Sequence, residues 1–171
     1  LSHTSDTMGI FETVLIVATL LCSLVAGLVF AFAVVVMPGI KDLKDGEFIR
    51  AFQVMDRVIQ NKQPLFMLVW VGSTLALIVA AGLGIAELTG VKRVLLIVAT
   101  SLYLFLVQLP TFTINIPLNN KLQTLDVDEM HERDQQQARA GFESRWNRWN
   151  AIRTLFASLV TALLLILLLQ Q

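Results

Sequence analysis

Four uncharged apolar runs divide the chain and constrain its fold more than any other feature. They cover residues 14–37, 65–86, 94–120 and 154–169, so the first three are 24, 22 and 27 residues long and the last is 16. A helix of about 20 apolar residues spans the ~30 Å hydrocarbon core of a bilayer. The first three runs are therefore long enough alone, and the fourth is long enough if its helix begins near Trp149.

The composition agrees with a chain that lies mostly in lipid. Hydrophobic residues make up 56% of the sequence and charged residues 15%, and the mean hydropathy is +0.70. A soluble domain of this size needs more polar surface than this composition supplies. We expect one all-α domain over residues 1–171, an integral membrane four-helix bundle in contact with lipid. Its helices are expected at about 9–37, 64–88, 91–114 and 150–170.

Basic residues gather in the two long connections between the runs, and only Lys92 and Arg93 lie in the short middle turn. By the positive-inside rule, segments 39–63 and 119–149 are expected to be cytoplasmic and both termini external. The formal net charge is zero, so overall charge gives no reason to expect a nucleic-acid partner. The basic residues of the two connections, counted to the start of the fourth run, are Lys41, Lys44, Arg50, Arg57, Lys62, Lys121, Arg133, Arg139, Arg145, Arg148 and Arg153.

Both long connections are expected to contain a helix. In the first, apolar residues recur at i, i+4, i+7 and i+11, which predicts an amphipathic helix over 46–61 that lies at the membrane face or plugs the mouth of the bundle. In the second, segment 126–148 is polar and free of proline, and it is expected to form a helical extension that runs into the fourth span. The apolar face of the first helix consists of Phe48, Phe52, Met55 and Ile59.

The first helix carries small residues on one face and a proline at its end. Thr19, Ser23 and Gly27 recur every four residues, and such a stripe lets a neighbouring backbone approach closely. It could also bury against a partner in a homo- or hetero-oligomer. The sequence Met37-Pro38-Gly39 is expected to end this helix, because proline disfavours helical geometry in the residue before it and glycine readily forms a turn.

A polar face occupies the second half of the third run. Its side chains fall at i, i+3, i+7 and i+11, and they cannot point at lipid. Pro110 and Pro117 each remove a backbone donor, so the helix is expected to kink or unwind there, which is tolerated only against protein or a water-filled cavity. The amides either tie helices together or line a ligand cavity. The face consists of Gln108, Thr111, Asn115 and Asn119.

The start of the fourth helix presents Trp146, Trp149, Asn150 and Arg153 at i, i+3, i+4 and i+7. In one interpretation Arg153 snorkels to lipid headgroups and the tryptophans form an interfacial belt. In the other, Arg153 points inward and its fork of donors holds an anionic or enolate-like ligand.

The sequence gives little reason to expect metal or thiol chemistry. Cys22 is the only cysteine, which excludes an intramolecular disulfide and a cysteine-based metal cage, and we expect it to pack as a small apolar residue. His131 lies among acidic residues but has no second histidine nearby, so no metal site is expected there.

Three segments together resemble a known family. The string FESRWNRWNAIR at 142–153, the N-x-P-x-N element at 115–119 and the proline turn at 36–39 are similar to those of the anthrone-oxygenase-like family, which are small four-helix membrane proteins. The resemblance covers nearly the whole chain. Two positions depart from the family's pattern: Asp56 stands where an asparagine is expected, and two residues separate Asn61 from the following proline.

The resemblance implies oxidation of an anthrone to an anthraquinone by O2, without a metal, a flavin or another cofactor. Such a reaction needs a base, donors for the enolate oxygen and an apolar aromatic slot. No Asp, Glu or His lies within the apolar runs, so Asp56 or a water would have to be the base, although we expect Asp56 to be a solvated helix residue. The implied catalytic residues are Arg153, Asn115 and Asn119, and the implied ligand-binding residues are Gln108, Thr111, Trp146, Trp149 and Asn150.

Two functions of different classes remain open. The first is a membrane-embedded binder of a lipophilic aromatic molecule, a phenol or a quinone, acting as a cofactor-independent oxygenase. It predicts a closed cavity between the third and fourth helices that is lined by the asparagines. The second is a non-catalytic helical subunit of a larger membrane complex, which predicts an exposed small-residue face on the first helix that buries against a partner.

Overall fold

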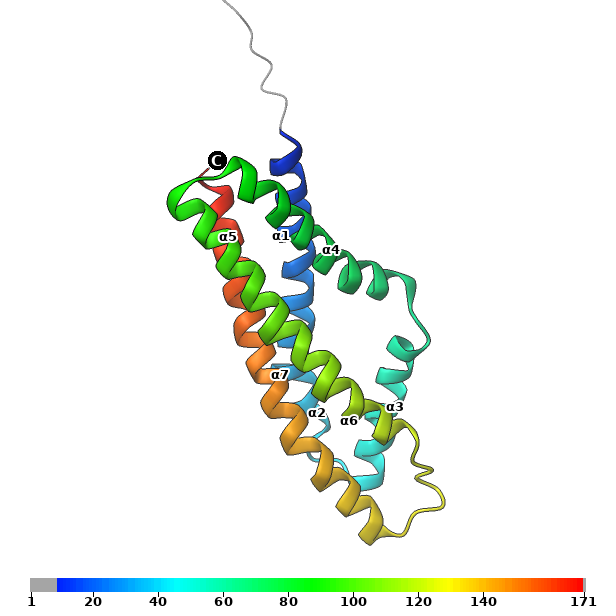
Figure 1. Cartoon of the computed structure of the whole chain (residues 1–171). Coiled ribbons are helices and arrows are strands. Elements are labelled where there is room, and N and C mark those ends of the chain that lie inside the picture. Colours follow the sequence, from blue (N-terminus) through cyan, green and yellow to red (C-terminus); the bar gives the residue numbers. More distant parts are fainter. Residues whose placement is uncertain (1–8, 171) are drawn as a thin grey trace, which may run out of the picture.

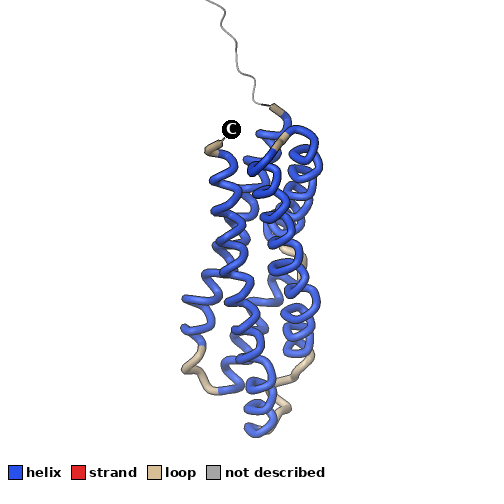
Figure 2. The backbone as a smooth tube through the Cα atoms, turned by 60° about the vertical axis from the view of Figure 1, so that its left-hand side comes forward, coloured by secondary structure: helices blue, strands red, loops and turns tan. Residues whose placement is uncertain are grey.

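The computed structural model describes residues 9–170, and within them every regular element is a helix (Figures 1 and 2). Four helical stretches are long and apolar enough to cross a membrane, which confirms the predicted all-α four-helix bundle. They run over Ile10–Ile40, Pro64–Glu87, Gly90–Gln123 and Glu132–Leu168.

The first and third spans are each built from several helical segments. The first consists of α1 (Ile10–Ala31), the π-turn η1 (Phe32–Val36) and α2 (Met37–Ile40). The third consists of α5 (Gly90–Leu102), the π-turns η2 (Tyr103–Gln108) and η3 (Thr111–Asn115), and α6 (Ile116–Gln123). The second span is α4 (Pro64–Glu87), the fourth is α7 (Glu132–Leu168), and α3 (Asp45–Gln60) connects the first two spans.

The helices run through their prolines, so the predicted helix end at Pro38 is wrong, whereas the helix is locally unwound into π-turns before Pro110 and Pro117, as expected. Each of Pro38, Pro110 and Pro117 follows a π-turn by two residues, and the N–H of the residue before each proline donates to the carbonyl five residues earlier. The wider turn makes room for a ring that would collide with the carbonyl four residues earlier in a regular α-helix. The first span therefore ends at Ile40 and the third extends to Gln123, nine residues beyond the predicted end.

The membrane core forms where α1 packs against α4 and α7, with α5 and η2 closing against α7. Most of its buried side chains are small or branched, and α1 contributes Leu15, Ala18, Cys22 and Val25. The prediction that Thr19, Ser23 and Gly27 form a packing face of the bundle is wrong at Gly27, which is exposed and has no neighbouring atom within 4 Å of the position of a Cβ. The stripe drifts away from the core because the buried residues of α1 follow a different face of the helix. Whether Gly27 meets a partner chain stays a prediction.

Gly84 of α4, by contrast, is tightly surrounded by side chains of the membrane core. A Cβ there would lie 2.3 Å from Leu96 Cδ2 and 2.9 Å from Phe11 Cε2. Such distances are far inside van der Waals contact, so the side chains of Leu96 and Phe11 would have to move to admit a larger residue where α4 meets α5 and α1.

A second apolar cluster lies beyond the membrane core, where α3 packs on α6 and the first half of α7. Phe48 and Phe52 are fully or almost fully buried in it, which confirms the predicted amphipathic helix and places it across the end of the bundle. The side-chain amide of Gln53 donates to the carbonyls of Leu122 and Leu125 at 2.8 and 2.9 Å, so α3 is also tied to the end of α6.

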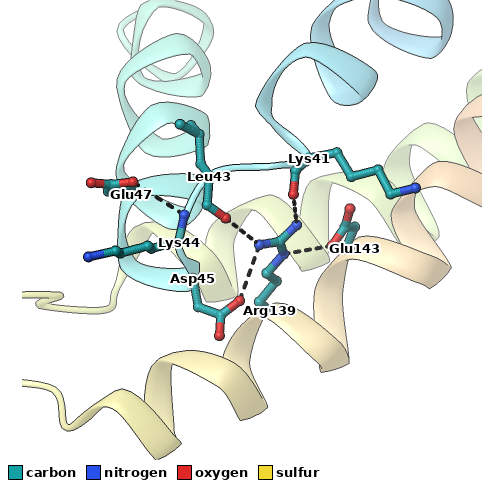
Figure 3. Close-up of polar contacts among 7 residues, drawn as sticks. All are labelled: Lys41, Leu43, Lys44, Asp45, Glu47, Arg139 and Glu143. Carbon is teal, nitrogen blue, oxygen red and sulfur yellow. Dashed lines mark hydrogen bonds and ion pairs between the residues drawn. The ribbon is translucent and has the colours of Figure 1, made fainter.

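Arg139 of α7 fastens the α2–α3 turn from the other side (Figure 3). Its guanidinium donates to the carbonyls of Lys41 and Leu43 at 2.6 and 2.8 Å, and to the carboxylates of Asp45 and Glu143 at 3.1 and 2.7 Å. A planar fork of donors can meet several acceptors at once, as it does here. Arg139 therefore fixes the start of α3, and Gln53 fixes its middle against α6.

Candidate functional site

A cavity of about 230 Å³ lies where α3 covers the end of the four spans. Side chains from η1, α3, α4, η3, α6 and α7 line it, so all four spans and the connecting helix contribute. The third and fourth spans supply most of its polar residues, as expected for a ligand site between them, and α3 adds Asp56. The cavity is not closed on every side, because some of its lining residues are exposed.

The walls of the cavity are mainly aromatic. Phe66 and Trp70 of α4 stack with ring centroids 5.5 Å apart and planes 17° from parallel. On the opposite side, Phe52 meets Trp146 edge to face at 5.4 Å, and Phe32 lies 5.8 Å from the same indole. Flat, rigid walls of this kind suit a planar apolar ligand.

Asp56 of α3 lines this cavity and is only 4% exposed. The expectation of a solvated carboxylate is therefore wrong, because α6 packs over this face of α3. Oδ1 accepts from Asn119 Nδ2 at 2.8 Å, and Oδ2 accepts from Gln60 Nε2 and Gln123 Nε2 at 3.0 Å each. Within residues 9–170, no basic side chain forms an ion pair with it. Three neutral amides thus orient a buried anion.

Arg153 of α7 lines the same cavity and is 5% exposed. It faces inward and does not snorkel to the headgroups. Nη1 donates to Thr111 Oγ1 at 3.0 Å and Nη2 to Asn150 Oδ1 at 2.8 Å, while the guanidinium carbon lies 5.8 Å from the centre of the Trp146 ring. No carboxylate of the described chain pairs with it, and its buried Nε lacks an acceptor. Of five N–H donors, two are therefore engaged in these bonds.

The three asparagines of the predicted site differ in how many of their side-chain hydrogen-bonding groups already have a partner in the protein. Asn119 bridges two neighbours, because its Oδ1 accepts from Trp146 Nε1 at 2.8 Å and its Nδ2 donates to Asp56. Asn150 is also held at both ends, since it donates to the Val29 carbonyl at 3.0 Å and accepts from Arg153. Asn115 is 2% exposed, its only donor contact is a long one of 3.5 Å, and its Oδ1 has no partner. It is the amide most available to a ligand.

Six of the eight predicted site residues line the cavity, and two do not. Gln108 is buried beside it and accepts from Trp70 Nε1 at 3.0 Å. Trp149 is half-buried and lies outside the lining. The six lining residues are Thr111, Asn115, Asn119, Trp146, Asn150 and Arg153.

The aromatic wall that α4 supplies was not predicted from the sequence. Trp70 is the only tryptophan of the second run, and its indole N–H needs an acceptor within the membrane. That requirement could have pointed to Gln108 and so to an α4 wall. In the described part of the chain, no group of three or more His, Cys, Asp or Glu side chains could hold a metal ion.

A family model described as anthrone oxygenase matches residues 55–163 of the chain. The matched segment begins just before Asp56 and ends beyond Arg153, so it includes both charged residues of the cavity together with Asn115, Asn119 and Trp146. Neither a curated protein nor a solved structure matches the chain.

Proposed function

Because this chain belongs to the anthrone oxygenase family, we propose that its cavity binds a lipophilic polycyclic phenol and oxidises it with O2, as an anthrone is oxidised to an anthraquinone. One observation carries the proposal. A buried carboxylate and a buried guanidinium line one aromatic cavity, and neither has an ion-pair partner within the described residues. Buried charges without partners are costly, and they are retained where a function uses them.

In the first step the carboxylate of Asp56 removes a proton from the acidic methylene carbon between the rings. The negative charge moves to the ring oxygen, which becomes an enolate. The unengaged N–H groups of Arg153 stabilise that oxygen, and the Asn115 amide adds a donor once it turns away from the Trp146 carbonyl. The site therefore supplies a base on one side of the ligand and an oxyanion partner on another.

In the second step the electron-rich enolate passes one electron to O2, and the two radicals combine to form a carbon–oxygen bond. Asp56 returns the first proton to the resulting peroxide and then removes the second proton from the same carbon. The oxygen–oxygen bond breaks, hydroxide leaves with that proton as water, and the carbon becomes a carbonyl. One atom of O2 thus enters the product and the other becomes water, and the balance needs no metal or flavin.

The surroundings of the two charges support this chemistry. An apolar cavity strengthens the attraction between the guanidinium and a developing enolate, because little water screens it. Asn119 is a positioning residue, since it connects the Asp56 carboxylate to the indole that forms a wall of the slot. Its two bonds fix the base relative to the plane of a bound ring.

The direct test is the rate of quinone formation from anthrone in air, with the full chain in lipid nanodiscs. Asp56→Asn should lower the protein-dependent rate by about 10²–10⁴-fold, which is the usual contribution of a general base. Asp128→Asn is the matched control, because Asp128 is an exposed carboxylate that pairs with Arg50 outside the cavity. A wild-type rate equal to that of empty nanodiscs would contradict the proposed activity. Equal rates for Asp56→Asn and Asp128→Asn would show that Asp56 is not the base.

We further propose that the cavity lies at the cytoplasmic end of the bundle. The basic residues of the two long connections support this orientation through the positive-inside rule. A non-catalytic subunit remains the alternative function, and the open face at Gly27 of α1 is the feature that favours it.

A further inference from the structure

The second and third spans separate on one side of the cavity. Ser73 and Trp70 of α4 still bond to the third span, through Tyr103 at 2.7 Å and Gln108 at 3.0 Å. Beyond Trp70, toward Pro64, α4 tilts away from α6 (Figure 1). In the described chain no hydrogen bond joins α4 to η3 or α6. Hydrogen bonds therefore hold the two spans together only on one side of the Trp70–Gln108 pair in the described chain.

The exposed lining residues of the cavity all lie on the two elements that separate here, α4 and η3. Three of its lining side chains are exposed there: Met67 and Val71 of α4, by 36% and 44%, and Phe112 of η3, by 60%. The opposite wall is sealed, since Trp146 and Asn150 are only 4% and 1% exposed. The opening is thus bordered entirely by apolar side chains, and we call Met67, Val71 and Phe112 the portal residues.

The opening lies at a depth where lipid covers the protein. Val71 precedes Glu87 by 16 residues, or about 24 Å along a helix at 1.5 Å per residue, and Phe112 follows Arg93 by 19 residues, or about 28 Å. Both distances fall within the ~30 Å hydrocarbon core measured from the charged turn between α4 and α5. On the side away from that turn, α3 covers the cavity and is held there by Gln53 and Arg139. The apolar opening therefore meets acyl chains near one membrane surface.

We propose that the portal residues border a lateral entrance through which the ligand passes from the bilayer directly into the cavity. This inference rests on the proposed function and specifies its substrate class: uncharged, flat, polycyclic phenols that dissolve in the membrane. Conjugates that carry a phosphate, a sulfate or a carboxylate are excluded, because a charge would have to cross an apolar opening. The product quinone leaves by the same route.

The experiment measures how fast 1,8-dihydroxyanthraquinone, a flat dihydroxy quinone, quenches tryptophan fluorescence of the full chain in nanodiscs. Two indoles, Trp70 and Trp146, line the cavity and report its occupation. Val71→Phe narrows the entrance and should slow association and dissociation together, on the order of tenfold, because an added barrier acts on both directions. Leu75→Phe is the matched control, since Leu75 is exposed one turn further along α4 but does not line the cavity. It should leave both rate constants unchanged.

Phe112→Ala provides a second variant, which widens the entrance and should accelerate both processes. Equal rates for Val71→Phe and Leu75→Phe, with saturable quenching preserved, would overturn the lateral entrance while leaving the proposed function intact. Slowing of dissociation alone would also overturn it, because Val71 would then act as a ligand contact. Absence of saturable quenching in the wild-type protein would overturn the proposed function and the entrance together.

Discussion

Replacing Arg153 by methionine should change the stability of the protein little but weaken ligand binding strongly. The guanidinium is 5% exposed and donates to two neutral acceptors, Thr111 Oγ1 and Asn150 Oδ1. Hydrogen bonds to a charged group contribute about 1.5–3 kcal/mol each. Against them stands the cost of burying an ion, which is several kcal/mol even after relaxation. The two terms nearly offset, so we expect Arg153→Met to change the free energy of unfolding of the ligand-free protein by less than about 2 kcal/mol.

Binding of an anionic ligand should respond very differently. Loss of a buried partner of a charged group costs about 2–5 kcal/mol, which corresponds to a weakening of at least about 30-fold. The assay is titration of the protein in nanodiscs with 1,8-dihydroxyanthraquinone, which enters the cavity uncharged and whose ionisation beside Arg153 is followed by the dye's visible absorption, alongside thermal unfolding. Arg153→Lys is the intermediate variant, since it keeps the charge but loses the planar fork. A fall in stability of more than about 3 kcal/mol with unchanged affinity would show that Arg153 is a structural residue and not a ligand contact.

Two further predictions concern packing and topology. Gly84→Ala should destabilise the protein by about 1–3 kcal/mol, because the new Cβ would collide with side chains of α5 and α1. The control Gly82→Ala, whose Cβ would lie in open space, should be neutral or stabilising by up to about 1 kcal/mol. Equal thermal unfolding of the two variants would contradict the close packing described at Gly84. In a Cys22→Ser background, single cysteines at Thr89 and Gln136 should react with an impermeant reagent from opposite sides of the membrane, Gln136 from the cytoplasmic side, and labelling of Gln136 from outside would reverse the topology.

The spans and the connecting helix could be predicted because their signals are local. Charge-free runs of bilayer length identify the four spans, and the apolar spacing from Phe48 to Ile59 identifies α3. The polar face of the third run was also readable, since side chains at i, i+4 and i+8 share a side of a helix even when π-turns interrupt it. Thr111, Asn115 and Asn119 accordingly line one cavity.

Asp56 could not be placed from its neighbours in the sequence. It stands beside Arg57 on a helix outside the membrane core, a setting typical of a solvated carboxylate. What buries it is the packing of α6, which brings Asn119 and Gln123 against it from more than 60 residues away. Contacts between residues so far apart in the sequence depend on how the whole bundle packs, and no local sequence pattern predicts them.

The roles of Gly27 and Pro38 were predicted wrongly for a different reason, whereas the irregular backbone expected near Pro110 and Pro117 is present as π-turns. A stripe of small residues shows that close packing is feasible, but it does not tell whether the stripe faces the bundle, lipid or another chain. In the same way, a proline predicts the end of a helix only if no wider turn precedes it. The π-turns before Pro38, Pro110 and Pro117 have no sequence signature of their own, and they kept the first and third spans continuous.

Asp56 and Arg153 are proposed to act on one ligand, Asp56 as base and Arg153 as oxyanion partner. Anaerobic hydrogen exchange tests this proposal most directly, because it reports proton removal from carbon without any reaction with O2. Anthrone deuterated at its methylene carbon is incubated in ordinary water with the full chain in nanodiscs, and loss of deuterium is followed by mass spectrometry. We predict that the wild-type protein accelerates the loss over empty nanodiscs and that Asp56→Asn and Arg153→Met each abolish the acceleration. Exchange no faster than in empty nanodiscs, or acceleration that survives both substitutions, would contradict the account.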